Sequence, residues 1–110
     1  MNERVKHLVP HLKRIKRSSV KDRRKMIKCC DKELVNCFCE CALNLLKGHV
    51  PVNKHQLSSL RRHKHSLKKL VLKKTPINQK KKILQKGGFL GALLTPVLAF
   101  LSNVFGGNGA

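Results

Sequence analysis

The last part of the chain, residues 87–110, has no ionisable side chain, yet it follows a stretch that is purely basic. Thirteen Lys and Arg and no acid lie between Cys41 and Lys86, and all five acids lie at or before Glu40. Such an apolar end must be buried among the chain's own helices or covered by a membrane or partner, because water disfavours a large exposed apolar surface. The formal net charge of +20 opposes compaction by self-repulsion, so a polyanionic partner is its simplest explanation.

Hydrophobic periodicity predicts an all-α protein, a small bundle of short basic helices followed by an uncharged apolar helical tail. The 110 residues suit one small domain with flanking segments. Composition divides them into a basic N-terminal arm at 1–19, a basic helical domain at 20–86 and an apolar, glycine-containing tail at 87–110.

Two helices are expected before residue 30. Apolar residues at helical spacing predict a helix over 1–18, which Pro10 interrupts. Ser19, with Asp22 three residues later, resembles a capping box and opens a short helix to about residue 28.

Three more helices are expected before the tail. Asp31 can cap the first of them. Asn53 and Gln56 resemble a second capping box, and Thr75 can cap a helix that starts with Pro76. The expected helices span 31–47, 54–73 and 76 to 85 or 86. The helix over 54–73 would turn leucines inward and a row of cations outward.

The cations of the last two of these helices are the expected phosphate contacts. Lys outnumbers Arg by eleven to two between Cys41 and Lys86, which favours binding without sequence preference, since bidentate base reading favours Arg. The alternative is a solvated helix face, although lysines four apart repel each other when no acid separates them. The candidate residues are Arg61, Arg62, Lys64, Lys68, Lys69, Lys73, Lys74, Lys80, Lys81 and Lys82.

Five cysteines raise the question of a metal site, but their spacing does not favour one. Structural zinc sites pair their ligands two to four residues apart in turns, whereas Cys37 and Cys41 would share one face of a helix and Cys39 another. We expect buried thiols instead, with disulfides as an alternative. No metal ligand, no cofactor and no catalytic residue is predicted, because no nucleophile has a recognisable partner.

The apolar tail leaves several structures open. The uncharged run from Phe89 to Phe105 is marginal for spanning a bilayer, and Thr95, Pro96 and other weakly apolar residues reduce its hydrophobicity further. It could lie in a membrane interface, pack on itself or on a capsid surface, or complete the core of the domain. The expected membrane or partner contacts are Phe89, Leu90, Leu93, Leu94, Val97, Leu98, Phe100 and Leu101.

The order of these segments also resembles a viral protein family. A basic segment, then Lys86-Gly87-Gly88, then the apolar run 89–98 with its proline is similar to the precursor of adenovirus core protein X (mu) and to small basic proteins of Polinton or adintovirus-type elements. The resemblance implies that a viral maturation protease cuts at Gly87 and Gly88. The two glycines have an alternative explanation as a helix stop and hinge.

Taken together, charge and resemblance predict a non-enzymatic minor viral core protein, or an endogenous virus-derived one. It would bind and condense double-stranded DNA, the viral genome, without sequence preference, and its tail could be released by cleavage near Gly88. The resemblance implies a place in the virion core and the host nucleus, with capsid proteins or an anionic membrane as partners of the tail. The alternative is a cationic membrane-active or membrane-anchored protein that uses the C-terminal apolar segment.

Overall fold

The protein is described by a computed structural model that covers the backbone of residues 3–104 and the side chains of residues 3–102. Residues 1–2 of the expected arm and 105–110 of the expected tail lie outside the described part. The described residues form seven α-helices and no strand, which confirms the all-α prediction. The helices are α1 (Glu3–Arg17), α2 (Val20–Cys29), α3 (Lys32–Leu46), α4 (Lys54–Arg62), α5 (Lys64–Val71), α6 (Ile77–Leu84) and α7 (Phe89–Val104).

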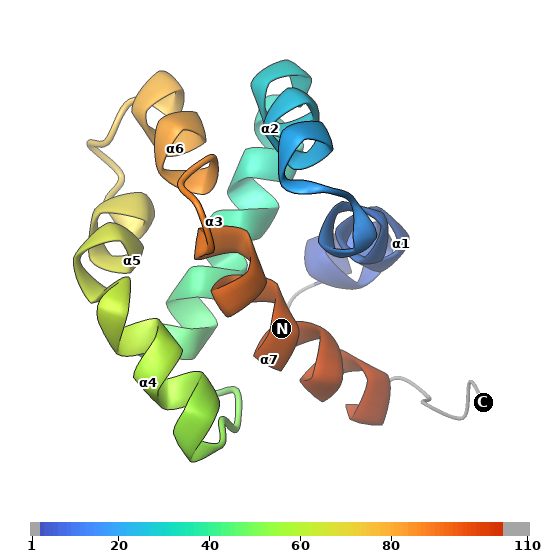
Figure 1. Ribbon diagram of the computed structural model, residues 1–110, viewed down its shortest axis with the longest axis vertical. Helices are drawn as coiled ribbons and strands as arrows, with labels where there is room; N and C mark the ends of the chain where they lie inside the picture. The colour runs from blue at the N-terminus through green and yellow to red at the C-terminus, as the bar shows by residue number, and fades with distance from the viewer. Residues whose placement is uncertain (1–2, 105–110) are drawn as a thin grey trace.

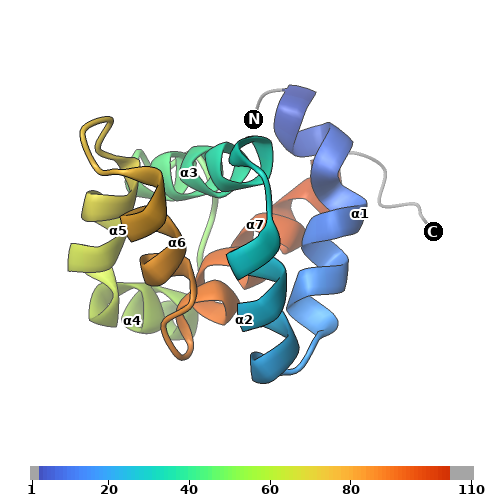
Figure 2. The same ribbon diagram turned by 90° about the horizontal axis from the view of Figure 1, so that it is seen from above.

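The uncharged helix α7 is the centre of the fold. It packs against α1, α3, α4 and α6, and Figures 1 and 2 show it with α1 and α2 on one side and α4, α5 and α6 on the other. Seven of its large apolar side chains are buried, as is Pro96, and Phe100 is half-buried. The seven are Phe89, Leu90, Leu93, Leu94, Val97, Leu98 and Leu101. Because a buried side chain of this size contributes about 1.5–3 kcal/mol, α7 supplies a large share of the hydrophobic stabilisation.

The other helices line the same core. Val5, Leu12 and Ile15 of α1 are buried in it together with Phe38 of α3 and residues of α5 and α6. Parts of the expected arm, domain and tail therefore share one core, and the boundaries in composition are not boundaries in packing.

Helix α1 runs through Pro10 without the expected interruption. The proline is exposed, and the buried residues Val5 and Leu12 hold the two halves of the helix on α7 and α3. Tertiary packing therefore outweighs the loss of one helical hydrogen bond, which usually bends or breaks a helix.

The expected starts at Ser19, Asp31 and Asn53 are confirmed. Each of these side chains accepts a hydrogen bond from the backbone N–H three residues later, at 2.8 to 3.1 Å. At Asn53 the box is reciprocal, because the Asn53 N–H donates to Gln56 Oε1 at 3.0 Å. Local hydrogen-bonding chemistry thus places three helix starts in the sequence.

The single helix expected over 54–73 is wrong, since the chain breaks at His63 into α4 and α5. The His63 backbone leaves the helical region, and its ring packs edge-on against Phe89 with the ring centroids 5.6 Å apart. The break lets α4 pack against α7 while α5 packs against α3, which one straight helix could not do.

The start of α6 also differs from the expectation. Thr75 is not its cap, because the Thr75 hydroxyl is buried and donates to the Lys69 carbonyl at 2.7 Å. Pro76 is the cap residue rather than the first helical one, and the helix ends at Leu84. The hydrogen bond of Thr75 instead stabilises the turn between α5 and α6.

Candidate nucleic-acid interface

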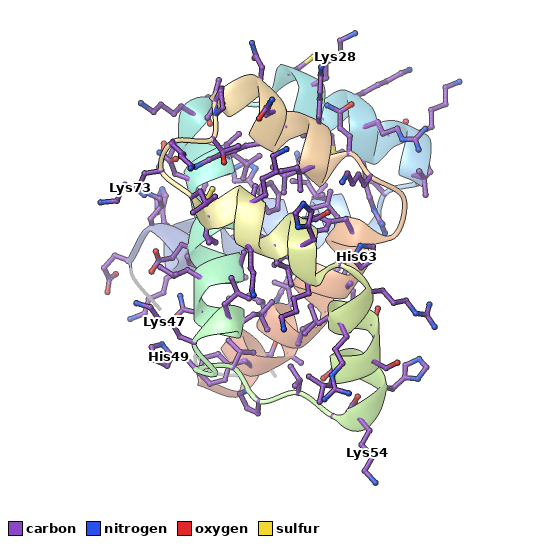
Figure 3. The ribbon with its side chains drawn as sticks, turned by 90° about the vertical axis from the view of Figure 1, so that its left-hand side faces the viewer. Lys28, Lys47, His49, Lys54, His63 and Lys73 are labelled. Atoms are coloured by element: carbon purple, nitrogen blue, oxygen red, sulfur yellow. The ribbon has the colours of Figure 1, made fainter. Side chains whose placement is uncertain are left out.

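The purely basic part of the sequence forms one side of the molecule. Helices α4, α5 and α6 lie together on the left of Figure 1, and Figure 3 shows this side from the front. Lys54 and Lys73 point outward at opposite ends of it (Figure 3). The acids lie elsewhere, on α1 and α2, at the Asp31 cap and on α3. No carboxylate side chain from α4, α5 or α6 therefore compensates the cations of this side.

Eight of the ten predicted phosphate contacts are exposed here. They come from α4, α5, the turn after α5 and α6, and we call them the cationic face. The cationic face consists of Arg61, Arg62, Lys64, Lys68, Lys69, Lys73, Lys74 and Lys82. Exposed, flexible lysines of this kind suit contacts to a phosphate backbone.

The remaining two predicted contacts, Lys80 and Lys81, are half-buried. Lys81 Nζ donates to the Cys30 carbonyl at 2.8 Å and to the Lys28 carbonyl at 3.3 Å, at the C-terminal end of α2. A cation is favourable there because the helix end carries unpaired carbonyls and partial negative charge. Burial raises the pKa of the Cys39 thiol, and the nearby Lys80 ammonium opposes that shift only in part. Both lysines therefore have partners within the fold.

A cleft between α5 and α6 interrupts the cationic face. It has a volume of about 260 Å³ and a single apolar wall residue, Ile83. Lys86 Nζ donates to Ser66 Oγ at 3.1 Å, and Ser66 is almost fully buried. The polar lining consists of His65, Ser66, Lys69, Gln79, Lys82 and Lys86.

Four of these lining residues were missed from sequence, although a signal for them existed. Lys82 is three residues and Lys86 seven residues after Gln79, and this spacing places the three residues on one side of α6 and of the turn that follows it. His65 and Ser66 lie one helical turn before Lys69. Only the packing of α5 against α6 brings the two groups together.

Two further hollows lie away from this cleft. A groove of about 340 Å³ between α1 and α7 is lined by Lys13, Lys16 and Arg17 on one wall and by Leu98 and other α7 residues on the other. An apolar groove of about 240 Å³ runs beside the partly exposed Leu46 and Leu57. Cations at the first groove show that basic surface extends beyond the cationic face.

The cysteines are free thiols, and within residues 3–104 no group of three or more potential ligands is placed to hold a metal ion. Cys37 and Cys41 are buried one turn apart on α3. Their mutual hydrogen bond, together with burial, raises the pKa of Cys41 well above its usual range. A protonated thiol at neutral pH is a poor nucleophile and metal ligand, which agrees with a packing role for Cys41.

Gly87 and Gly88 form an exposed turn between α6 and α7. Gly88 has a φ of 78°, in the left-handed region, whereas Gly87 has no positive φ. The turn redirects the chain by 85° between α6 and α7, and α7 then enters the core. Gly88 therefore has a conformational role there, and the peptide bond between the glycines is at the surface.

Within the described residues, no single helix has the length and hydrophobicity needed to cross a membrane. Helix α6 and residues 89–102 of α7 have the required length and hydrophobicity only when they are taken together, and the two helices are bent by 85° relative to each other. Comparison with protein families, curated proteins and solved structures finds no match to the chain.

Proposed function

We propose that the protein binds and condenses double-stranded DNA without sequence preference, through the cationic face. The observation that supports this most is the exposure of eight cations on α4, α5, α6 and the turn between the last two, with no acid on those elements. Lys and Arg that neutralise phosphates release condensed counterions, and this term does not depend on base sequence. Six of the eight are Lys, which acts as a point charge and not as a bidentate reader of bases.

The test is a salt titration with two unrelated duplexes of equal length. If the cationic face neutralises six to eight phosphates, log K should fall with log salt with a slope of about −5 to −7. The two duplexes should bind with similar affinity. A flat salt response, or binding confined to one sequence, would contradict the proposal.

A matched pair of variants locates the interface. Lys64→Gln with Lys74→Gln removes two exposed cations from the cationic face, and Lys21→Gln with Lys25→Gln removes two exposed cations from α2. The first pair should reduce the steepness of the salt slope by about 2, and the second should change it much less. If both pairs of substitutions changed the salt slope equally, DNA would bind over the whole surface of the protein rather than through the cationic face.

Because the sequence resembles the mu precursor, we further propose that the protein is viral or virus-derived and acts in a virion core. The exposed turn at Gly87 and Gly88 is accessible to a maturation protease. Because α7 is buried among the other helices, a cut there would nick the folded protein and leave α7 in place. Cleaved protein should elute as one species under native conditions and separate into two fragments in denaturant. Native release of the C-terminal fragment would contradict this.

One observation supports the membrane-active alternative: α6 and α7, taken together as a bent pair, are long and apolar enough to cross a membrane. Inserting α7 into lipid would keep its own side chains in an apolar medium but would expose to water the core side chains of the other helices that it covers. At about 1.5–3 kcal/mol for each such side chain, exposing about five of them would cost about 8–15 kcal/mol. That is comparable to the whole stability of a small domain, so insertion would require unfolding. Leakage of anionic vesicles with simultaneous loss of native tertiary structure would favour this alternative over DNA binding.

A further inference from the structure

The cleft between α5 and α6 is where the cationic face becomes concave. Lys69, Lys82 and Lys86 line the same volume of about 260 Å³, together with His65. No carboxylate lines this cleft. Three cations gathered in a hollow focus a positive potential more strongly than the same charges on a convex surface.

The cleft also offers hydrogen-bond donors from both of its walls. Helix α5 contributes Lys69 and Ser66, and α6 contributes Gln79 and Lys82. The bond from Lys86 Nζ to Ser66 Oγ, at 3.1 Å, joins the segment that follows α6 to α5. Because this bond restricts the Lys86 side chain, less conformational entropy is lost when the ammonium group meets a ligand. Exposed lysines such as Lys68 and Lys73 lie outside the cleft.

We propose that this cleft binds a pair or short run of neighbouring phosphate groups and thereby anchors a duplex backbone on the cationic face. Ammonium groups suit phosphate oxygens as point charges, and charge-assisted hydrogen bonds are about twice as strong as neutral ones. The inference deepens the proposed function and rests on it for the duplex. The same chemistry occurs in free linear polyphosphate, so the experiment includes both ligands.

The experiment compares two variants of the full chain that lose the same charge. Lys69→Gln with Lys82→Gln removes one cation from each wall of the cleft, and Lys68→Gln with Lys73→Gln removes two exposed cations outside it. Affinity is measured for a duplex of arbitrary sequence and for tripolyphosphate at one salt concentration. Circular dichroism verifies that both variants are folded, which we expect because all four lysines are exposed.

The cleft variant should bind tripolyphosphate about a hundredfold more weakly than the control variant, because it loses two charge-assisted hydrogen bonds and each is equivalent to about one factor of ten. It should also bind the duplex more weakly than the control variant, by a smaller factor, because Lys68 and Lys73 contribute phosphate contacts of their own. In amide NMR spectra of the unmodified protein, tripolyphosphate should shift the signals of Ser66, Gln79 and Ile83 first. An equal loss in both variants, with no localised shifts, would overturn the inference and leave general DNA binding intact. Tripolyphosphate binding without duplex binding would keep the cleft as a site for free polyphosphate and overturn the proposed function.

Discussion

Gly88 shows how one backbone angle decides whether a residue can be replaced. Its φ of 78° suits glycine, whereas its neighbour Gly87 has no positive φ and no atom within 4 Å of an added Cβ. At Gly88 an added Cβ would lie 3.9 Å from His63 Nε2, which is an ordinary contact. Space is therefore available at both positions, and only the backbone conformation separates them.

We expect Gly88→Ala to lower the free energy of unfolding by about 1–2 kcal/mol, the cost of a left-handed conformation for a residue with a Cβ. Gly87→Ala is the matched control and should leave stability unchanged or raise it by about 0.4–1 kcal/mol. Urea denaturation measures both. If the two variants lost equal stability, the turn would depend on flexibility at both positions and not on the angle at Gly88.

Lys81 is a second case in which adjacent residues have different roles. Its ammonium group donates to two carbonyls at the end of α2, whereas Lys82 is exposed in the α5–α6 cleft. Lys81→Met should reduce the free energy of unfolding by about 1 kcal/mol more than Lys82→Met, because it leaves carbonyls at a helix end without their cation. Chemical denaturation of both variants tests this, and each variant loses one positive charge. Equal stability would show that water replaces Lys81 without loss.

At the scale of the element, α7 contributes more buried apolar side chains to the core than any other described helix. Leu93 in its first half is fully buried, and Ser102 near its end is exposed. Leu93→Ala should destabilise the fold by about 2–5 kcal/mol, from lost burial and the cavity left behind. Ser102→Ala should stay within about 0.5 kcal/mol of the original protein. Thermal denaturation measures both, and a small effect of Leu93→Ala would mean that α7 is only loosely held by the core.

The starts of the helices could be predicted from sequence, but their packing could not. Ser19, Asp31 and Asn53 cap their helices through hydrogen bonds three residues away, and such chemistry is visible in a short window. The break at His63 depends on contact with Phe89, which is 26 residues later in the sequence. The burial of α7 likewise depends on four other helices, and hydrophobicity alone does not distinguish a core helix from a membrane segment.

The candidate site, like the fold, could be predicted from sequence only in part. A run of cations indicates a basic surface, so the eight exposed residues of the cationic face could be chosen from sequence. The partners of Lys81 are the carbonyls of Lys28 in α2 and of Cys30 directly after it, some fifty residues away in sequence, and therefore could not be inferred. The α5–α6 cleft required knowledge of which helices are neighbours, because its residues are unremarkable on each helix alone.

At the scale of the whole molecule, the net charge of +20 is held within dimensions of 36 × 26 × 25 Å. Electrostatic interactions extend about 30 Å at 0.01 M salt but only about 8 Å at 0.15 M. At low salt every cation therefore repels cations across the entire protein, and at physiological salt it repels only its neighbours. Folding brings these charges closer together than in the unfolded chain, so the repulsion opposes the folded state.

Stability and DNA binding should consequently respond to salt in opposite directions. Raising the salt from about 0.01 to about 0.15 M should stabilise the free protein by at least about 1 kcal/mol, or raise Tm by about 4–8 °C, because the repulsion is screened. The affinity for duplex DNA should fall over the same range, because counterion release becomes less favourable. Calorimetry measures the first effect and fluorescence anisotropy the second.

The variant Lys68→Gln with Lys73→Gln is the control and should gain less stability from salt, since it has less repulsion to screen. A Tm that falls as salt is added would show that favourable ion pairs outweigh repulsion, and the net charge would then not require a polyanion.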